Sequence, residues 1–341
     1  MKKGYSKVSI LLMVLIVLIS TVSNLFGDSN KSASLDDFFK STEWVTENAK
    51  NIVIVDVRPS SDYSKGHIPG AINIPRDSFY FERKQVDGKE IKYDIPTQAE
   101  LIDILTINGI TPESVVVAYD LDVSSYGGRF PWVLRSYGHQ KAYVINGGID
   151  KWKDADGRPL ETKKNIPSPS AVPYKNSDIG LYRATKADVA SVIDTARGNI
   201  TKSGYVLSDV RSIGEYEGSA LLDKSNNARP GHIPYAVFSD YNTFAYTDYL
   251  DAKGKPVPSS LQKGHNVQVL KSAEELKAAF AAKGITPDKT IINYCEGGFR
   301  SGVYTLILLG LGYKNVYNYD GSWNEWSKQG NQYPVSLISG K

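Results

Sequence analysis

The fold of this chain is decided by the stretch IINYCEGGFRSG, residues 291–302, which continues into the apolar run Val303–Leu311. It predicts a buried strand, a glycine-containing loop that begins at Cys295 and ends at Arg300, and then a helix. Such a turn aims loop N–H groups and a helix N-terminus at negative charge on the sulfur. A lone cysteine is more often a small buried apolar residue, but this loop favours a nucleophile.

A second feature is an internal duplication. Asp-Val-Arg, Gly-His-Ile-Pro and Gly-Ile-Thr-Pro occur in the same order at residues 56–58, 66–69 and 109–112, and again at 209–211, 231–234 and 284–287. A repeat of this length indicates duplicated domains rather than a solenoid of short repeats. Trp152 and Trp326 correspond in the same way and are expected in the two cores.

Short apolar runs alternate with helical patterns in both halves. Val115–Tyr119 and Thr290–Tyr294 are predicted strands, whereas Gln98–Leu105 and Ala273–Phe280 are predicted helices. This alternation indicates an α/β fold in which each half is a mainly parallel sheet with helices on both faces. Ligands of open α/β sheets bind beyond the carboxyl ends of strands, which is where Cys295 is expected.

Length and composition bound the domain organisation. The 341 residues, with 41% hydrophobic and 23% charged side chains, are enough for two folded domains. We expect a signal peptide or N-terminal anchor at residues 1–27, a first domain at 35–155, a linker at 156–180 and a second domain at 181–335. The linker assignment rests on a stretch rich in charge, proline and serine.

The N-terminal segment predicts an exported protein, which is periplasmic, secreted or membrane-anchored. Lys2, Lys3 and Lys7 precede the apolar run Val8–Ile19, which is short for a membrane span and typical of a signal peptide. Those lysines account for the formal net charge of +3, so the rest of the chain is nearly neutral. No nucleic-acid partner is expected, and membrane contact is expected only through this segment. With one cysteine and four histidines at unsuggestive spacings, no metal site is expected.

The ordered motifs, present twice and with a Cys-x-x-x-x-Arg loop only in the second copy, resemble the rhodanese family in its two-domain sulfurtransferase form. The resemblance covers residues from about Leu35 to Trp326 and implies two tandem rhodanese-like domains, the first without a catalytic cysteine. Asp120 takes the cysteine position of the first domain, since 295 − 120 = 175 equals the offset 284 − 109 of Gly-Ile-Thr-Pro. The stretch from Asp120 to Arg129 is also longer than the six-residue loop, which agrees with a silent domain.

The resemblance implies a reaction through a covalent Cys295 persulfide, with no other cofactor. Cys295 would take a sulfane sulfur from a small donor, with thiosulfate favoured over 3-mercaptopyruvate. It would then pass that sulfur to a thiophilic acceptor such as cyanide, a thiol or a dithiol protein.

The expected site is built around the loop. We expect catalytic roles for Cys295 and Arg300, persulfide binding by Glu296, Gly297, Gly298, Phe299 and Ser301, and supporting roles for Asp209, Arg211 and Trp323. The N–H groups from Glu296 to Ser301 should converge on the sulfur, and Trp323 is a candidate apolar wall of the pocket. The Asp209–Arg211 pair is expected to be structural, because Asp56 and Arg58 repeat it in the silent domain. His67 and His232 are expected to form local hydrogen bonds.

Two acidic residues depart from the family pattern. Glu296 stands where donor-selective members carry basic or small polar residues, and Glu215 stands where a substrate-binding arginine is expected. These departures leave the sulfur donor open and motivate an alternative, a persulfide carrier that serves one protein partner without turnover. A cysteine-dependent phosphatase or arsenate reductase is less favoured, because such loops have five residues between cysteine and arginine and this one has four.

Overall fold

The computed structural model describes residues 33–84, 90–122, 125–170, 180–194, 199–200, 202–221, 229–241, 246–248, 255, 267–328 and 333–337. The expected leader at residues 1–27 lies outside the described residues. In the part of the chain that is described, no helix combines the length and the apolar character needed to cross a membrane.

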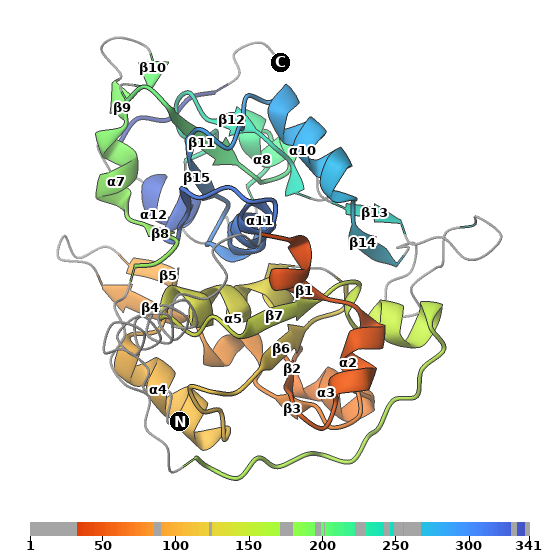
Figure 1. Ribbon diagram of the computed structural model, residues 1–341. Coiled ribbons are helices and arrows are strands. Elements are labelled where there is room, and N and C mark those ends of the chain that lie inside the picture. The colour runs from red at the N-terminus through yellow and green to blue at the C-terminus, as the bar shows by residue number, and fades with distance from the viewer. Residues whose placement is uncertain are drawn as a thin grey trace, which may run out of the picture. The chain divides into compact units, whose positions relative to one another are not determined.

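The first half begins at a short 3₁₀ turn, η1 (Leu35–Asp37), and ends near residue 155 (Figure 1). Its elements are β1 (Phe39–Lys40), α2 (Thr42–Asn48), β2 (Val53–Asp56), α3 (Ser60–Lys65), β3 (Ile72–Asn73), η2 (Arg76–Ser78), β4 (Phe81–Lys84), β5 (Glu90–Asp94), α4 (Gln98–Ile107), β6 (Val116–Tyr119), α5 (Ser125–Ser136), β7 (Ala142–Ile145), α6 (Gly148–Asp150) and the π-helical η3 (Lys151–Ala155).

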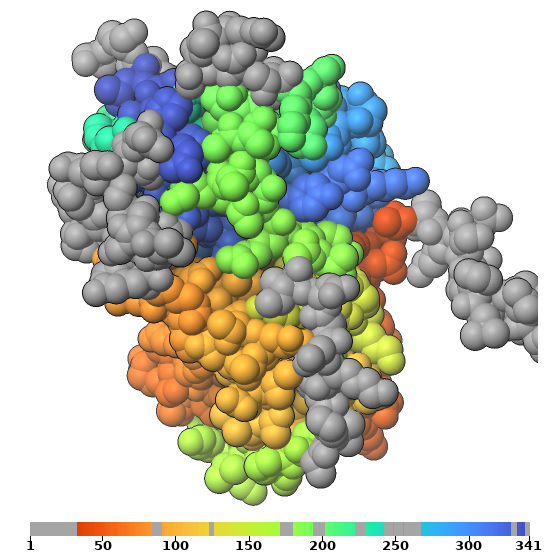
Figure 2. All heavy atoms as spheres, turned by 90° about the vertical axis from the view of Figure 1, so that its left-hand side faces the viewer, coloured from red at the N-terminus to blue at the C-terminus, as the bar shows by residue number. Residues whose placement is uncertain are grey.

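The second half repeats this succession with additions. Its elements are β8 (Arg183–Ala184), α7 (Lys186–Ser191), β9 (Ile193–Asp194), β10 (Asn199–Ile200), β11 (Tyr205–Asp209), α8 (Ile213–Glu217), β12 (Val237–Phe238), β13 (Tyr246–Asp248), β14 (Gln268–Leu270), α10 (Ala273–Ala282), β15 (Thr290–Tyr294), α11 (Phe299–Gly310), β16 (Val316–Tyr319) and α12 (Ser322–Trp326). Figure 2 shows α7, in green, at the surface of this half.

The two five-stranded sheets are parallel and share one topology. The first sheet has the order β1-β7-β6-β2-β3 and the second the order β12-β11-β15-β16-β8. Read from opposite edges, the two orders match strand for strand, so the duplication seen in the motifs is a duplication of the fold. In the second sheet β15 is central, pairing with β11 through Ile292↔Leu207 and with β16 through Ile292↔Tyr317.

Three layers of apolar side chains hold these sheets in place. One core surrounds α5 and α11, which contact each other, and it continues from one half of the chain into the other. The outer faces carry separate cores, around Trp152 in the first half and around Trp323 and Trp326 in the second. The alternation along β15 sends Ile291 to the shared core and Ile292 to the outer one, as expected for a strand buried on both faces.

Helices α5 and α11 approach each other closely at Gly128 of α5. A Cβ atom on Gly128 would lie 2.2 Å from Val303 Cγ2, so only glycine allows this spacing. The helix that follows the silent loop therefore packs directly against the helix that follows the cysteine loop.

Candidate active site

Cys295 follows the last residue of β15 and precedes the first turn of α11, as the sequence predicts. Its side chain is buried, with 1% of the residue exposed. Gly298 is the N-cap of α11 and has φ +80°, a left-handed conformation that favours glycine. The first N–H groups of a helix have no partner within it, so the start of α11 offers donors beside the sulfur.

The hydrogen-bonding partner of the sulfur is a side chain. Ser301 Oγ lies 3.4 Å from Cys295 Sγ and 2.6 Å from Asn318 Oδ1. Asn318 Nδ2 in turn donates to the Gly298 carbonyl at 2.9 Å, which fixes the orientation of the amide. The convergence of the loop N–H groups on the sulfur stays a prediction, and the hydroxyl of Ser301 is the contact that the structure gives to Sγ.

Arg300, the last residue of the loop, forms a two-pronged ion pair with Glu215 of α8. Its Nη1 and Nη2 atoms each lie 2.8 Å from a carboxylate oxygen of Glu215. Burial acts to raise the pKa of Glu215, but the hydrogen bonds and charge of Arg300 outweigh it and lower that pKa to about 2. Burial likewise acts to lower the pKa of Arg300, and Glu215 raises it instead. The positive charge of Arg300 is therefore balanced by the carboxylate of Glu215.

A second buried ion pair lies behind the loop. Arg211 Nη2 lies 2.7 Å from Asp209 Oδ2, donates to the Gly231 carbonyl at 2.7 Å, and lies over the Trp323 ring at 4.5 Å. Glu296 is buried and close enough to help raise the pKa of Arg211, against the effect of burial and after the larger effect of Asp209. The negative charge of Glu296 is thus partly balanced by Arg211, and its side chain is buried rather than exposed to solvent.

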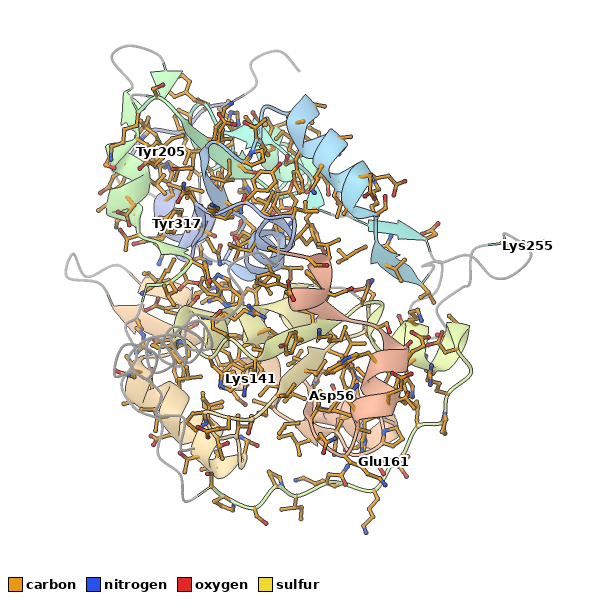
Figure 3. All side chains as sticks on the ribbon, viewed as in Figure 1. Asp56, Lys141, Glu161, Tyr205, Lys255 and Tyr317 are labelled. Atoms are coloured by element: carbon orange, nitrogen blue, oxygen red, sulfur yellow. The ribbon has the colours of Figure 1, made fainter. Side chains whose placement is uncertain are left out.

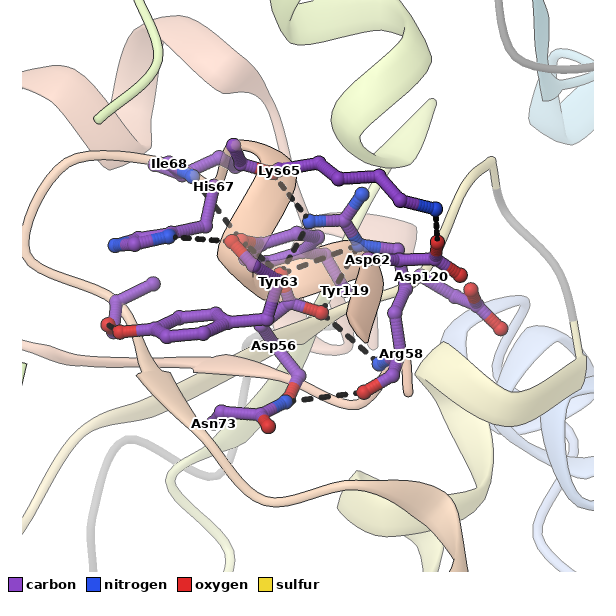
Figure 4. A network of polar contacts seen from close by, with 12 residues as sticks. Asp56, Arg58, Asp62, Tyr63, Lys65, His67, Ile68, Asn73, Tyr119 and Asp120 are labelled. Atoms are coloured by element: carbon purple, nitrogen blue, oxygen red, sulfur yellow. Dashed lines mark hydrogen bonds and ion pairs between the residues drawn. The ribbon is translucent and has the colours of Figure 1, made fainter. Parts of the chain in front are cut away.

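The silent domain contains the same ion pair without a thiol, as Figure 4 shows. Arg58 Nη2 lies 2.5 Å from Asp56 Oδ2 and donates to the Gly66 carbonyl at 2.8 Å, and Tyr119 donates to Asp56 at 2.7 Å. Because the pair is retained where Asp120 replaces the cysteine, the structural interpretation of Asp209 and Arg211 is supported.

The two motif histidines form matching local contacts. His67 Nδ1 lies 2.8 Å from the Tyr63 carbonyl and stacks on the Tyr63 ring, and His232 Nδ1 lies 2.9 Å from the Tyr216 carbonyl and stacks on the Tyr216 ring. Burial lowers the pKa of His232, although the Tyr216 carbonyl acts against this. Both histidines hold the turn that the sequence predicts.

Helix α12 holds the loop through backbone hydrogen bonds. The N–H groups of Trp323 and Asn324 donate to the carbonyls of Cys295 and Glu296 at 3.0 and 2.9 Å. Trp323 is fully buried, and its Nε1 donates to the Arg229 carbonyl at 3.1 Å. The interpretation of Trp323 as a wall of the pocket is therefore wrong, because its ring fills the space beneath Arg211. Its supporting role fits these contacts.

Arg129 lies in a different element from the one that the sequence predicts. It lies inside α5 rather than in a long silent loop, and its side chain is fully buried. Its Nη1 atom donates to the Gly298 carbonyl at 3.1 Å and lies 2.5 Å from Asp320 Oδ1. No motif marks this contact, because it joins residues that are 169 positions apart.

One surface cavity lies away from this site. It has a volume of about 450 Å³ and is lined by residues that include Thr290, Tyr205 and Tyr317, the last two of which are labelled in Figure 3. Thr290 is the first residue of β15 and Cys295 follows the last, so this cavity is at the opposite ends of the strands. Among the described residues, no group of three His, Cys, Asp or Glu side chains could hold a metal ion.

Comparison with known proteins agrees with the duplicated fold. A thiosulfate sulfurtransferase of Azotobacter vinelandii is 30% identical over 290 residues, which is 85% of this chain and 93% of that protein. The sulfur carrier protein TtuD of Thermus thermophilus is 30% identical over 311 residues, 88% of this chain and 96% of that protein.

Among solved structures, wild-type EanB superposes with a TM-score of 0.68 at 20% identity, covering 89% of this chain and 70% of that one. This likeness concerns the fold. The rhodanese-like domain matches residues 41–155 and again residues 192–329. The chain therefore belongs to the rhodanese family and carries two rhodanese-like domains, as its repeated motifs predict.

Proposed function

We propose that this protein is a sulfurtransferase that moves a sulfane sulfur through a persulfide on Cys295. The observation that carries the proposal is the placement of the single cysteine at the carboxyl end of a central parallel strand, beside a helix N-terminus, Arg300 and Ser301. Membership of the rhodanese family and relatives named thiosulfate sulfurtransferase support it.

The proposed reaction has two steps, and thiosulfate is the proposed donor. The Cys295 thiolate attacks the outer sulfur of thiosulfate, the sulfur–sulfur bond of the donor breaks, and sulfite leaves with the bonding electrons. The carbon of cyanide then attacks the outer sulfur of the persulfide, thiocyanate leaves, and the thiolate is restored. A thiol or dithiol protein can replace cyanide as the acceptor. The loop from Glu296 to Ser301 would hold the persulfide, and Arg300 would orient the donor.

Thiocyanate formation tests this proposal. Steady-state assays with thiosulfate and cyanide should show turnover in the wild-type protein and none in Cys295→Ser. Release of phosphate from an aryl phosphate, lost in Cys295→Ser, would instead show a phosphatase. Absence of thiocyanate with thiosulfate and with 3-mercaptopyruvate would refute turnover on small donors.

A persulfide carrier is the second candidate. It is favoured by the ion pair that neutralises Arg300, because this pair removes a charge that would otherwise bind an anionic donor. The relative named sulfur carrier protein also supports it. A stable persulfide on Cys295 without steady-state turnover would favour the carrier over the enzyme.

We also propose that the protein is exported, on the strength of the lysines and apolar run before residue 28. Cell fractionation with an antibody to the folded part tests this, and a purely cytoplasmic signal would contradict it.

A further inference from the structure

We propose that Arg129, which belongs to the domain without a cysteine, is a positioning residue for the Cys295 loop. The inference rests on the proposed function of that loop and adds a role for the silent domain. In this account the silent domain is retained because it holds the shape of the loop that carries the chemistry.

Arg129 joins three segments that meet at the loop. Its Nη1 atom donates to the Gly298 carbonyl at 3.1 Å, and its Nη2 atom donates to the Tyr93 carbonyl of β5 at 3.1 Å. The same Nη1 atom lies 2.5 Å from Asp320 Oδ1, just after β16. The planar guanidinium, with donors fixed in a fork, suits such a junction better than a single ammonium.

The Gly298 carbonyl is the point through which Arg129 acts. It accepts from Arg129 and, at 2.9 Å, from Asn318, which also binds the hydroxyl of Ser301. A trans peptide places the carbonyl of one residue opposite the N–H of the next. Holding the Gly298 carbonyl therefore fixes the direction of the Phe299 N–H, the first donor of α11. Residue 298 has no room for a side chain beside this contact, since a Cβ there would lie 2.6 Å from Arg129 Nη1.

Phe299 anchors the loop in a cage formed by the silent domain. Its ring meets those of Tyr80, Tyr93 and Tyr126 edge to face, with centroids 5.5, 5.5 and 5.0 Å apart. The guanidinium of Arg129 lies 5.0 Å from the Phe299 ring. The loop thus has its carbonyl and its aromatic side chain held by the same neighbouring domain.

Arg129 is expected to act through geometry rather than through its charge. Asp320 compensates that charge, and Arg183 Nη2 lies 3.4 Å from the other oxygen of Asp320. The function of Arg129 should therefore be lost in Arg129→Lys, which keeps the charge but not the fork.

The test compares Arg129 with a matched arginine on the same helix. Arg135 is also buried in α5 and donates to the carbonyls of Ala142 and Asp37, but it does not contact the loop. The variants are Arg129→Lys, the double variant Arg129→Met with Asp320→Asn, which leaves no unpaired buried carboxylate at this position, and Arg135→Met. Each is measured below its own melting temperature, which circular dichroism gives.

Two readouts separate positioning from folding. One is kcat and KM for thiocyanate formation, and the other is the rate of Cys295 alkylation by iodoacetamide as a function of pH. Loss of loop geometry should lower kcat about 10- to 100-fold with a smaller change in KM and should move the pH profile of alkylation. Arg135→Met should change kcat by less than about twofold while folded.

Two results would overturn the proposal. One is a folded double variant with wild-type kcat and alkylation profile. The other is an equal loss in Arg135→Met at the same fraction folded. If no donor supports turnover in the wild-type protein, the proposed function fails, but the alkylation profile still decides the role of Arg129.

Discussion

Replacing Glu215 with glutamine is the most informative perturbation of the electrostatics of the site. In the structure Glu215 occupies both outer nitrogens of Arg300, at 2.8 Å each. An anionic donor must therefore approach an arginine whose charge is already balanced. Glu215→Gln keeps the size of the side chain and removes its charge, which should make Arg300 a better partner for thiosulfate.

The size of this effect follows from Coulomb's law. A donor on the far side of the Arg300 guanidinium would lie about 6–7 Å from the Glu215 carboxylate, where two unit charges interact by about 2–3 kcal/mol at an effective dielectric constant of about 20. Removing that repulsion should raise kcat/KM for thiosulfate about 30- to 150-fold. The gain should be smaller for 3-mercaptopyruvate, because it carries less negative charge.

The same substitution should reduce stability. Lowering the pKa of Glu215 from 4.5 to about 2 corresponds to about 3 kcal/mol at neutral pH. Because the folded pKa is depressed, this contribution is complete above about pH 5 and is lost as the pH falls toward 2. The difference in unfolding free energy between wild type and Glu215→Gln should therefore shrink over that range.

Steady-state kinetics with both donors, together with denaturant unfolding, measure these effects. Glu217→Gln on the same helix is the control and should change neither quantity appreciably. A folded Glu215→Gln protein whose kcat/KM for thiosulfate is unchanged or lower would contradict this prediction. Such a result would mean that Glu215 orients Arg300 for the donor rather than competing with it.

Three further predictions concern neighbouring contacts. Burial, followed by the negative charge of Asp320, raises the pKa of Asp94 to about 6, although Arg183 and Arg83 act against this. Ionisation of Asp94 in the folded state therefore costs stability as the pH rises from about 4 to 6, and the melting temperature of Asp94→Asn relative to wild type should be higher at pH 8 than at pH 4. Ser301→Ala should slow alkylation of Cys295 about tenfold at neutral pH, because it removes a hydroxyl 3.4 Å from Sγ that can turn its single hydrogen from Asn318 Oδ1 to the thiolate. Gly298→Ala should lower both the melting temperature and kcat, because it strains a left-handed residue by about 1–2 kcal/mol.

Local pattern was sufficient to predict much of the fold. The predicted strand Thr290–Tyr294 matches β15, and the predicted helices correspond to α4 and α10. Their periodicity depends on neighbours in sequence, and the repeated motifs then imply the same topology twice. The ion pair between Asp209 and Arg211 was predictable for the same reason, because its two residues lie only two positions apart in the chain, as do Asp56 and Arg58.

The contacts that tune the site depend on distant parts of the chain. Glu215 was identified as an unusual residue, but its pairing with Arg300 brings together side chains 85 positions apart. Arg129 was assigned to a loop because no pattern marks the start of α5, and its contact with Gly298 crosses from one domain to the other. Trp323 was given a place in the pocket because the sequence does not reveal that Arg211 covers its ring.

The most direct test of the central claim is the intact mass of the protein after incubation with a sulfur donor and then with cyanide. We predict that thiosulfate or 3-mercaptopyruvate adds one sulfur atom to the wild-type protein, that cyanide removes it as thiocyanate, and that Cys295→Ser gains nothing. A wild-type protein that gains no sulfur from either donor, or a Cys295→Ser protein that gains as much as the wild type, would contradict it.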